Sequence, residues 1–371
     1  MTRVPFLAPT FPSPSVVAKD YAAIVRHGIF TNSGPVERAF ATSLASWIGP
    51  GVAVSLVSSC TAGLELAIRA VFLAGREFAV VPSFTFAAGP LAIRRCGYTP
   101  VFVDIGETSW QPDLDDAEAF LTREARHVAG ILLATTFGVA NEEVKRWEAL
   151  AHLHGLPLVI DSAAGFGSVY SWGERVGARG DCEVFSLHAT KTLAIGEGGA
   201  VAARDSAITT TIDQLKNFGF DSRRQAVLCG TNAKLSELSA AIGLRQLEVL
   251  TERLERRHRI LAKYKATLPS ECVAFQPGAE RSALPFVSAL LRSHTARDAL
   301  VEALDEAEVE CRIYYNPPVH SQPIFADASS CAGLETTGDV AGRIISLPMS
   351  DRLRRQTIAR IGEVAQAVLR G

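Results

Sequence analysis

The sequence predicts a three-layer α/β domain on a mainly parallel, doubly wound sheet, followed by a smaller α+β domain. Two observations lead to this prediction. Short apolar or β-branched runs alternate with helical patterns up to about residue 204, and a long polar-rich helical pattern then precedes a second set of strands and helices. Strands that alternate with helices are typical of parallel sheets covered on both faces. Because 371 residues exceed one typical domain, we expect a large domain over residues 1–250 and a small one over 251–371.

Seven segments of the first part carry the strand pattern. Several are apolar throughout, as in Gly130-Ile-Leu-Leu-Ala134, which suits strands buried on both faces. Helical patterns lie between them, such as Thr61–Leu73, which Gly75 follows as a stop signal. The predicted strands are Val52–Ser58, Phe78–Pro82, Thr99–Asp104, His127–Thr135, Pro157–Asp161, Glu183–His188 and Gly199–Ala203.

The second part begins with leucines at helical spacing over residues 234–268, which predicts one long helix joining the two domains. After it, strands are expected at Val273–Phe275, Pro285–Leu291 and Val309–Tyr315, and helices at Ala296–Glu306 and Arg352–Leu369.

Composition excludes several classes of protein. A hydrophobic content of 48% with 20% charged residues is that of a globular protein, and the net charge of -2 argues against nucleic acid or an anionic membrane as partner. We expect neither a signal peptide nor a membrane span, because no apolar stretch is long enough. The seven cysteines are scattered without a CxxC pair, which predicts no disulfide framework, no metal site and a cytoplasmic location.

The most informative stretch is Glu183-Val-Phe-Ser-Leu-His-Ala-Thr-Lys-Thr-Leu-Ala-Ile-Gly-Glu-Gly-Gly199, where Lys191 follows almost directly after a predicted strand. Open α/β sheets place their ligands at the carboxyl ends of strands. A lysine shielded from water there has a lowered pKa and acts as a nucleophile toward an aldehyde. From this segment alone, a lysine in a surface loop is the favoured interpretation.

Two further sites follow strands. Asp161 ends the run Pro157-Leu-Val-Ile-Asp161, where a buried carboxylate needs a cation such as a pyridinium nitrogen, although it could also cap the next turn. Ser58-Ser-Cys-Thr-Ala-Gly63 lies between a strand and a helix, where free N–H groups suit a phosphate. Thr61 and Ser186 could each add a hydroxyl there. The same turn is also an ordinary helix cap.

The phosphate turn, the strand-end Asp161 and Lys191 occur together in this order, and so resemble the large domain of fold-type I enzymes that use pyridoxal 5'-phosphate (PLP). More narrowly, the chain resembles the DegT/DnrJ/EryC1/StrS family of sugar aminotransferases almost from end to end. The run from Ser186 to Gly199 is the most specific match. The other matching segments are Thr31-Asn-Ser-Gly-Pro35, Pro82-Ser-Phe-Thr-Phe86, Val101-Phe-Val-Asp104, Asn217-Phe-Gly219, Gly230-Thr-Asn-Ala-Lys-Leu-Ser-Glu237 and Arg312-Ile-Tyr-Tyr-Asn-Pro-Pro-Val-His320.

The resemblance implies a role for each matched residue. Lys191 would be the Schiff-base lysine and proton carrier, and Asp161 would hold the pyridine nitrogen. Phe86 would stack on the cofactor ring, and Cys60, Thr61 and Ser186 would line the phosphate site. Asn217 would reach the phosphate of a second subunit, which implies a homodimer with shared active sites. Tyr314 and His320 match a loop that faces the sugar substrate.

Three positions depart from the family pattern. Ala164 stands where most relatives carry Gln or His near the phenolic oxygen of the cofactor, and Thr136 where His or Asn is usual. Ala233-Lys234 replaces the usual Tyr/Phe-Arg pair. Lys191, which relatives that only dehydrate have lost, is kept.

The function implied is amino transfer from L-glutamate or glutamine to a nucleotide-linked 3- or 4-keto-deoxysugar, with PLP as cofactor. Two alternatives stay open: a PLP aminotransferase acting on a non-sugar ketone such as a cyclitol, and a non-catalytic regulatory relative that keeps the fold. The sequence does not identify the nucleotide, the sugar or the carbon that is aminated.

Overall fold

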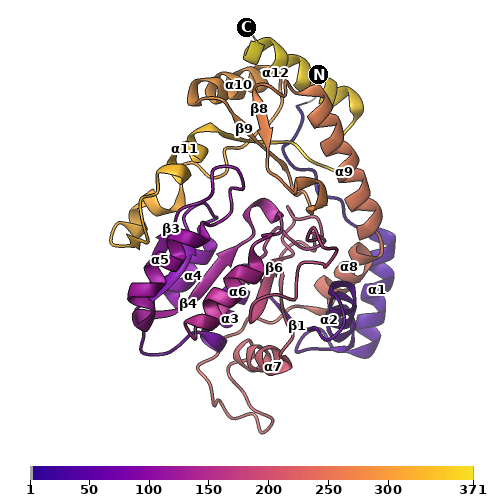
Figure 1. The fold of residues 1–371 in the computed structure, drawn as a ribbon. Helices are drawn as coiled ribbons and strands as arrows, with labels where there is room; N and C mark the ends of the chain where they lie inside the picture. The colour runs from indigo at the N-terminus through magenta and orange to yellow at the C-terminus, as the bar shows by residue number, and fades with distance from the viewer. Residues whose placement is uncertain (1–2, 371) are drawn as a thin grey trace.

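A large sheet of eight strands organises the first part of the chain. The computed structural model describes residues 3–370, and the sheet has the order β1-β7-β6-β5-β4-β2-β3-β10. Its strands β1, β3, β4 and β6 are labelled in Figure 1. Its pairs are parallel except for those of β7, which runs antiparallel to both of its neighbours. The strands are β1 (Ala53–Val57), β2 (Phe78–Pro82), β3 (Thr99–Val103), β4 (Val128–Ala134), β5 (Leu158–Asp161), β6 (Cys182–Ser186), β7 (Gly199–Ala203) and β10 (Ser329–Ser330).

Helices cover both faces of this sheet, which confirms the predicted α/β class. One core contains residues of α2 (Pro35–Ile48), α5 (Leu114–Glu124), α6 (Val144–Leu153) and α8 (Glu237–Glu248). The core on the other face contains residues of α3 (Cys60–Val71), α4 (Ala88–Arg95) and α7 (Ser206–Leu215). The outlying α1 (Pro14–His27) packs on α8.

The strand directions decide where a ligand site lies. Because β7 is antiparallel to β1 and to β6, these two strands share the direction of β2, β4 and β5. The carboxyl ends of all five therefore meet at one edge of the sheet, which is where open α/β sheets bind ligands.

The second part of the chain forms its own antiparallel sheet and core at the top of Figure 1, near both termini. Its three strands, in the order β11-β9-β8, pack with α9 (Leu250–Thr267), α10 (His294–Glu306), α11 (Glu335–Arg343) and α12 (Arg355–Arg370). The strands are β8 (Val273–Phe275), β9 (Val287–Leu291) and β11 (Ile344–Leu347). Single 3-10 turns lie at Ala125–His127, Thr136–Gly138, Ala279–Arg281, Val319–Ser321 and Pro323–Phe325.

Contacts cross the expected domain boundary near residue 250 in both directions. Val4 bridges to Val309 and Leu7 to Met349, while β10 returns to pair with β3 of the large sheet. The boundary itself stays a prediction.

Among the described residues 3–370, no helix combines the length and apolar character that a bilayer-spanning segment needs.

Two predicted elements were wrong. The long helix over residues 234–268 is two helices, because Val249 (φ -105°, ψ 4°) leaves the helical conformation between α8 and α9. The leucine spacing continues through this break, so periodicity alone could not reveal it. The predicted strand Val309–Tyr315 makes only isolated bridges, from Val309 to Val4 and from Arg312 to Ser346. Because its partners are two different segments, no continuous ladder forms.

Candidate active site

A cavity of about 390 Å³ opens at the carboxyl edge of the large sheet. The loops after β1, β2, β4, β5 and β6 line it, together with residues near β9 and the tyrosine pair of the second part. The structure brings seven of the nine predicted site residues to this cavity: Cys60, Thr61, Phe86, Asp161, Ser186, Lys191 and Tyr314. Asn217 and His320 do not line it.

Asp161 is the last residue of β5 and is 7% exposed. Its Oδ1 accepts a hydrogen bond of 3.0 Å from the backbone N–H of Ala163, and no ion pair reaches it from the described residues. Burial raises the pKa of Asp161 to about 6, while the Ala163 N–H and the positive charge of Lys191 oppose the rise. A protonated nitrogen of a bound ligand would stabilise the charged form of such a buried carboxyl group.

Lys191 follows β6 by five residues, in a segment without helix or strand. Burial lowers the pKa of its ammonium group, and the negative charges of Cys60 and Asp161 would oppose this effect. A lowered pKa increases the fraction of neutral amine, which is the form that attacks a carbonyl carbon and accepts a proton.

The turn between β1 and α3 supplies the third part of the site. Ser59 caps α3, since its hydroxyl oxygen accepts a hydrogen bond of 3.1 Å from the N–H of Ala62. The first-turn N–H groups of Cys60 and Thr61 lack partners within the helix, as at any helix start, and both residues line the cavity. A Cβ added at Gly199, which pairs with Ser186, would lie 2.7 Å from the Cys60 nitrogen. Only glycine therefore lets β7 approach this turn.

Aromatic side chains form one wall of the cavity. Tyr315 stacks on Phe137 with ring centroids 5.6 Å apart, and Phe86, which is 61% exposed, lies 6.2 Å from Tyr315. Tyr314 packs against Phe286. Of these rings, Tyr314 and Phe86 were predicted from the sequence as site residues. Tyr315 and Phe137 were not, although Tyr315 lies in the matching segment 312–320 and Phe137 follows Thr136.

The cavity lining also includes an imidazole and a carboxylate. His188 Nδ1 lies 2.9 Å from Thr190 Oγ1, and its Nε2 lies 3.5 Å from Glu197 Oε1. All three residues line the cavity. Neither Thr190 nor Glu197 was predicted from the sequence as a site residue.

The profile of the DegT/DnrJ/EryC1/StrS aminotransferase family matches residues 16–366. The chain belongs to this family. Among relatives, protein Rv3402c of Mycobacterium tuberculosis H37Rv is 41% identical over all of this chain and 91% of its own length.

Other members of the family are more distant but carry names that state an activity. The UDP-N-acetyl-3-dehydro-alpha-D-glucosamine 3-aminotransferase of Acidithiobacillus ferrooxidans is 29% identical over 96% of this chain and 98% of its own. GDP-perosamine synthase of Escherichia coli O157:H7 is 29% identical over 83% of each chain. The crystal structure of DesI with its TDP-sugar product is 30% identical, with a TM-score of 0.89 over 99% of this chain and 93% of that one.

Two of the positions that depart from the family pattern, Thr136 and Ala164, line the cavity. Gly138 (φ 83°), two residues after Thr136, approaches the second of them, because a Cβ there would lie 2.2 Å from the Ala164 carbonyl oxygen. Thr136 is 4% exposed, and its hydroxyl has no hydrogen-bond partner among the described residues. A buried hydroxyl without a partner is costly, so this group is suited to a ligand atom.

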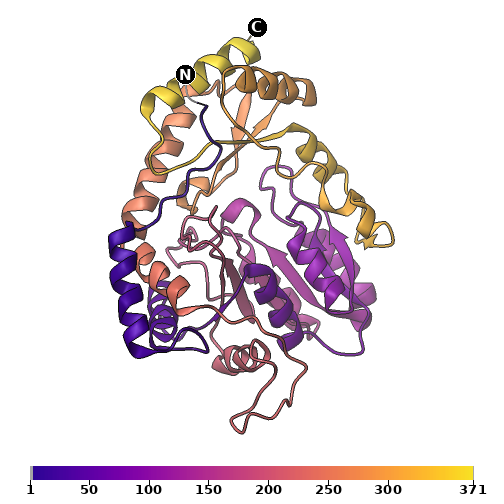
Figure 2. The same cartoon turned by 180° about the vertical axis from the view of Figure 1, so that it is seen from behind.

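The two predicted site residues outside the cavity make other contacts. Asn217 Oδ1 accepts a hydrogen bond of 3.1 Å from Lys234 Nζ at the base of a loop that projects from the molecule (Figure 2). The ring of His320 meets Phe102 edge-on, and burial lowers its pKa while Asp104 opposes this. Their proposed roles stay predictions.

Metal ligands are not gathered here. Within residues 3–370, the structure contains no group of three or more His, Cys, Asp or Glu side chains arranged to hold an ion.

Proposed function

We propose that this protein is a PLP-dependent aminotransferase that moves an amino group from L-glutamate or glutamine to a nucleotide-linked ketosugar. One observation carries the proposal: the buried Asp161 and the half-buried Lys191 line one cavity beside the N-terminal turn of α3. An acid without a cation, a lysine of lowered pKa and a helix N-terminus fit the pyridine nitrogen, the aldehyde and the phosphate of PLP respectively.

The residues that would hold the cofactor are those of this cavity. PLP, when bound, supplies an electron sink that stabilises negative charge at the Cα of the amino donor. Cys60 and Thr61 would bind the phosphate through their N–H groups, with the Ser186 hydroxyl nearby. Asp161 would keep the pyridine nitrogen protonated, because a buried carboxylate is stabilised by a positive partner. Phe86 would pack against the ring.

Lys191 would have two tasks. Its Nζ would bind the cofactor aldehyde covalently and, once displaced by the donor amine, would remove the proton from the donor Cα. Both tasks require the neutral amine, which the burial of Lys191 favours. The aromatic wall formed by Tyr315 and the buried Phe137 would exclude water while the proton moves.

The substrate class rests on the family. Relatives are named for UDP-linked and GDP-linked sugars, and DesI for a TDP-sugar product, which supports a sugar nucleotide as acceptor here.

A homodimer with shared active sites is part of the same proposal. Asn217 lies outside the cavity of its own chain, and the loop beyond it exposes the apolar Phe218, Val227 and Leu228. Exposed apolar side chains on a projecting loop suit a partner surface. A cytoplasmic location, expected from seven cysteines that are all unpaired, completes the proposal.

The test of the central claim is reductive labelling. Purified protein is incubated with PLP, reduced with borohydride and mapped by mass spectrometry, and we expect the label on Lys191. The Lys191→Ala variant should lose both the label and the absorbance band of the lysine-bound cofactor. Lys145→Ala is the matched control, since Lys145 is an exposed residue of α6 whose ammonium group lies over the Trp172 ring. A label on another lysine in the wild type would contradict the assignment.

The acceptor is tested with enzyme first converted by glutamate to its amino form. We expect a panel of UDP-, GDP- and dTDP-linked ketosugars to regenerate PLP far faster than free keto acids other than 2-oxoglutarate. Tyr314→Ala should slow this half-reaction more than His320→Ala, because only Tyr314 lines the cavity. Regeneration by a free cyclitol ketone and by none of the sugar nucleotides would overturn the substrate class and leave amino transfer standing.

A further inference from the structure

The segment that carries Lys191 lacks regular secondary structure between β6 and β7. Its start is fixed locally, because the N–H of Lys191 donates to the His188 carbonyl at 2.9 Å and that of Ala189 to the Gly196 carbonyl at 2.8 Å. The residues directly after Lys191 are held differently, by side chains of α8 and α9.

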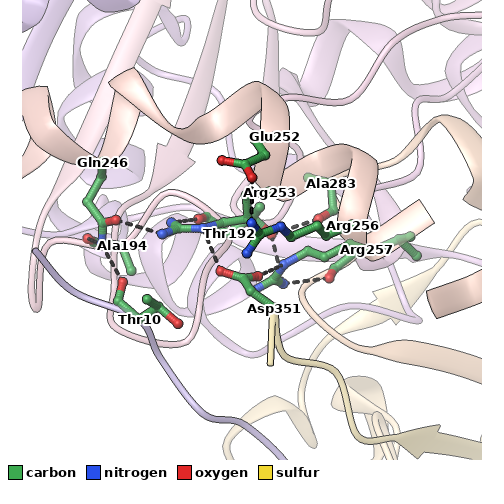
Figure 3. Close-up of polar contacts among 11 residues, drawn as sticks. Thr10, Thr192, Ala194, Gln246, Glu252, Arg253, Arg256, Arg257, Ala283 and Asp351 are labelled. Atoms are coloured by element: carbon green, nitrogen blue, oxygen red, sulfur yellow. Dashed lines mark hydrogen bonds and ion pairs between the residues drawn. The ribbon is translucent and has the colours of Figure 1, made fainter. Parts of the chain in front are cut away.

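Two arginines of α9 clamp Thr192, the residue after Lys191 (Figure 3). Arg253 Nη1 donates to the Thr192 carbonyl at 2.8 Å, and Arg257 Nη1 donates to Thr192 Oγ1 at 3.2 Å. The Thr192 hydroxyl in turn donates to the Ala283 carbonyl at 2.7 Å. Both the backbone and the side chain of this one residue are therefore fixed.

A glutamine forms further hydrogen bonds to the same segment. Gln246 of α8 donates through Nε2 to the carbonyls of Ala194 and Thr10, both at 2.8 Å, and accepts from Arg253 Nη2 at 2.8 Å. Four separate parts of the chain thus meet at the residues that follow Lys191.

One carboxylate joins the two arginines. Asp351, in the segment between β11 and α12, lies 2.7 Å from Arg253 Nε and 2.8 Å from Arg257 Nε. The three side chains are 7–8% exposed, so the cluster carries a buried net charge of +1. Buried ion pairs are costly to form, and replacing them with apolar groups is often neutral or stabilising, so stability alone is a weak reason to build one.

The cluster and Lys191 also line one crevice together. A narrow crevice is lined by Lys191, Thr190, Arg253, Arg257 and Asp351. Residues 7–10 of the N-terminal segment line it too. Lys191 thus faces the active-site cavity and this crevice at once.

We infer that Arg253, Arg257 and Asp351 are positioning residues that hold the Lys191 loop and set a net positive charge beside it. The inference rests on the proposed role of Lys191. Anchoring Thr192 fixes where the Lys191 backbone starts its side chain, and a misplacement of about 1 Å is enough to slow a reaction by roughly a hundredfold. Because Asp351 belongs to the second part of the chain, the same contacts tie that part to the reactive lysine.

The net charge of the cluster also allows a test, because variants that lower it and variants that raise it should shift the titration of the Lys191-bound cofactor in opposite directions. Arg253→Met reduces the cluster from +1 to neutral, and Asp351→Asn raises it to +2. The two should move the pH at which the Lys191-bound cofactor loses its proton in opposite directions, up and down respectively, each by roughly half a unit. Other charged or titratable groups that face Lys191 are unchanged in both variants: Asp161 from β5, Cys60 from α3, and His188, Glu197, Tyr314 and Tyr315 around the cavity.

The experiment is an absorbance titration of wild type and variants loaded with PLP, with the rate of the glutamate half-reaction measured alongside. We expect opposite shifts and a loss of rate of at least about tenfold in both variants. Arg256→Met is the control, because Arg256 is 49% exposed, pairs with Glu252 and should behave as wild type. Arg257→Lys keeps the positive charge but loses the planar guanidinium group, which bonds Thr192 and Asp351 at the same time. It should therefore slow the half-reaction without shifting the titration.

The outcomes separate this inference from the proposed function. If wild type takes no label at Lys191, the proposed function fails first. If wild type is labelled, shifts of both charge variants in the same direction, or none, overturn the inference. Should Arg253→Met not fold by circular dichroism, Asp351→Asn and Arg257→Lys decide by the same criteria.

Discussion

Lys216 and Glu37 form a buried ion pair of 3.3 Å, with side chains only 4% and 3% exposed. Lys216 Nζ also lies 2.7 Å from Asp213 and donates to the Leu56 carbonyl at 2.9 Å. This lysine immediately precedes Asn217, so the ion pair anchors the base of the projecting loop to α2 and to β1. Burial raises the pKa of Glu37, and the charge of Lys216 opposes that rise.

The first prediction concerns this anchor. Lys216→Met should lower the free energy of unfolding by about 3–5 kcal/mol, because it leaves Glu37 buried without its cation. Adding Glu37→Gln to that variant should recover part of the loss. Urea unfolding of the four proteins forms a double-mutant cycle. A double variant that loses the sum of both single effects would show that the pair is not coupled.

The second prediction concerns the buried charge of Asp161. Its pKa is raised to about 6 in the folded chain, so the acid stabilises the cofactor-free fold below pH 4. That contribution is lost as the pH rises through 6. Asp161→Asn should therefore be more stable than wild type at pH 7.5 without cofactor, by at most about 3 kcal/mol, and similar to it near pH 4. With PLP bound, the order at pH 7.5 should reverse.

Asp104 provides the contrast for that experiment. Its carboxylate accepts hydrogen bonds from Thr336 N–H at 3.0 Å and Thr337 N–H at 2.8 Å, at the start of α11. Because its charge is satisfied, Asp104→Asn should destabilise the cofactor-free protein at pH 7.5. Unfolding curves at the two pH values measure both variants, and a destabilised Asp161→Asn at pH 7.5 would argue against an unsatisfied acid.

The parts of the site that the sequence predicts are those that depend on strand order alone. Asp161 and Ser186 end their strands, Lys191 and the Cys60-Thr61 turn follow theirs, and strands that run in one direction bring such positions to one edge. Strands β2, β7 and β8 match their predicted residues because each is a short apolar run between polar residues or turns. Local pattern is sufficient in these cases.

The rest depends on contacts between distant segments. Tyr315 and Phe137 meet only after the second part of the chain folds onto the first, and neither carries a local signal for a site. The break at Val249 and the failed strand at Val309–Tyr315 likewise depend on which segments lie alongside. Helix α11 and strand β11 were missed altogether, because their residues lie beyond the segments whose pattern was distinct.

The third prediction uses the hydroxyl of Thr136. Thr136→Val keeps the shape of the side chain and removes a buried group that has no partner within residues 3–370. The cofactor-free protein should therefore be as stable as wild type or slightly more so. Binding of PLP, or of substrate to the loaded enzyme, should weaken about threefold to tenfold if the hydroxyl contacts either.

Thr136→Ser is the matched control, since it keeps the hydroxyl and loses a methyl group. It should bind PLP and substrate nearly as wild type does. Equilibrium titration of cofactor absorbance and the KM for each substrate are the measurements. Wild-type values of all of them in Thr136→Val would assign the hydroxyl no role in binding.

The last prediction tests the shared active site. Asn217 makes its hydrogen bond with Lys234 outside the cavity of its own chain, on a loop whose apolar Phe218, Val227 and Leu228 are exposed. If this loop completes the site of a second copy, Lys191→Ala and Asn217→Ala proteins should each be inactive or nearly so. Mixed and allowed to exchange subunits, they should regain up to about a quarter of wild-type activity, because each hybrid dimer contains one site with both residues intact. Mixing Lys191→Ala with Asp161→Asn is the control, since both residues lie in the same cavity and no hybrid restores it. Activity that stays at the level of the separate variants, or a fully active monomer in sedimentation at assay concentration, would exclude the shared site.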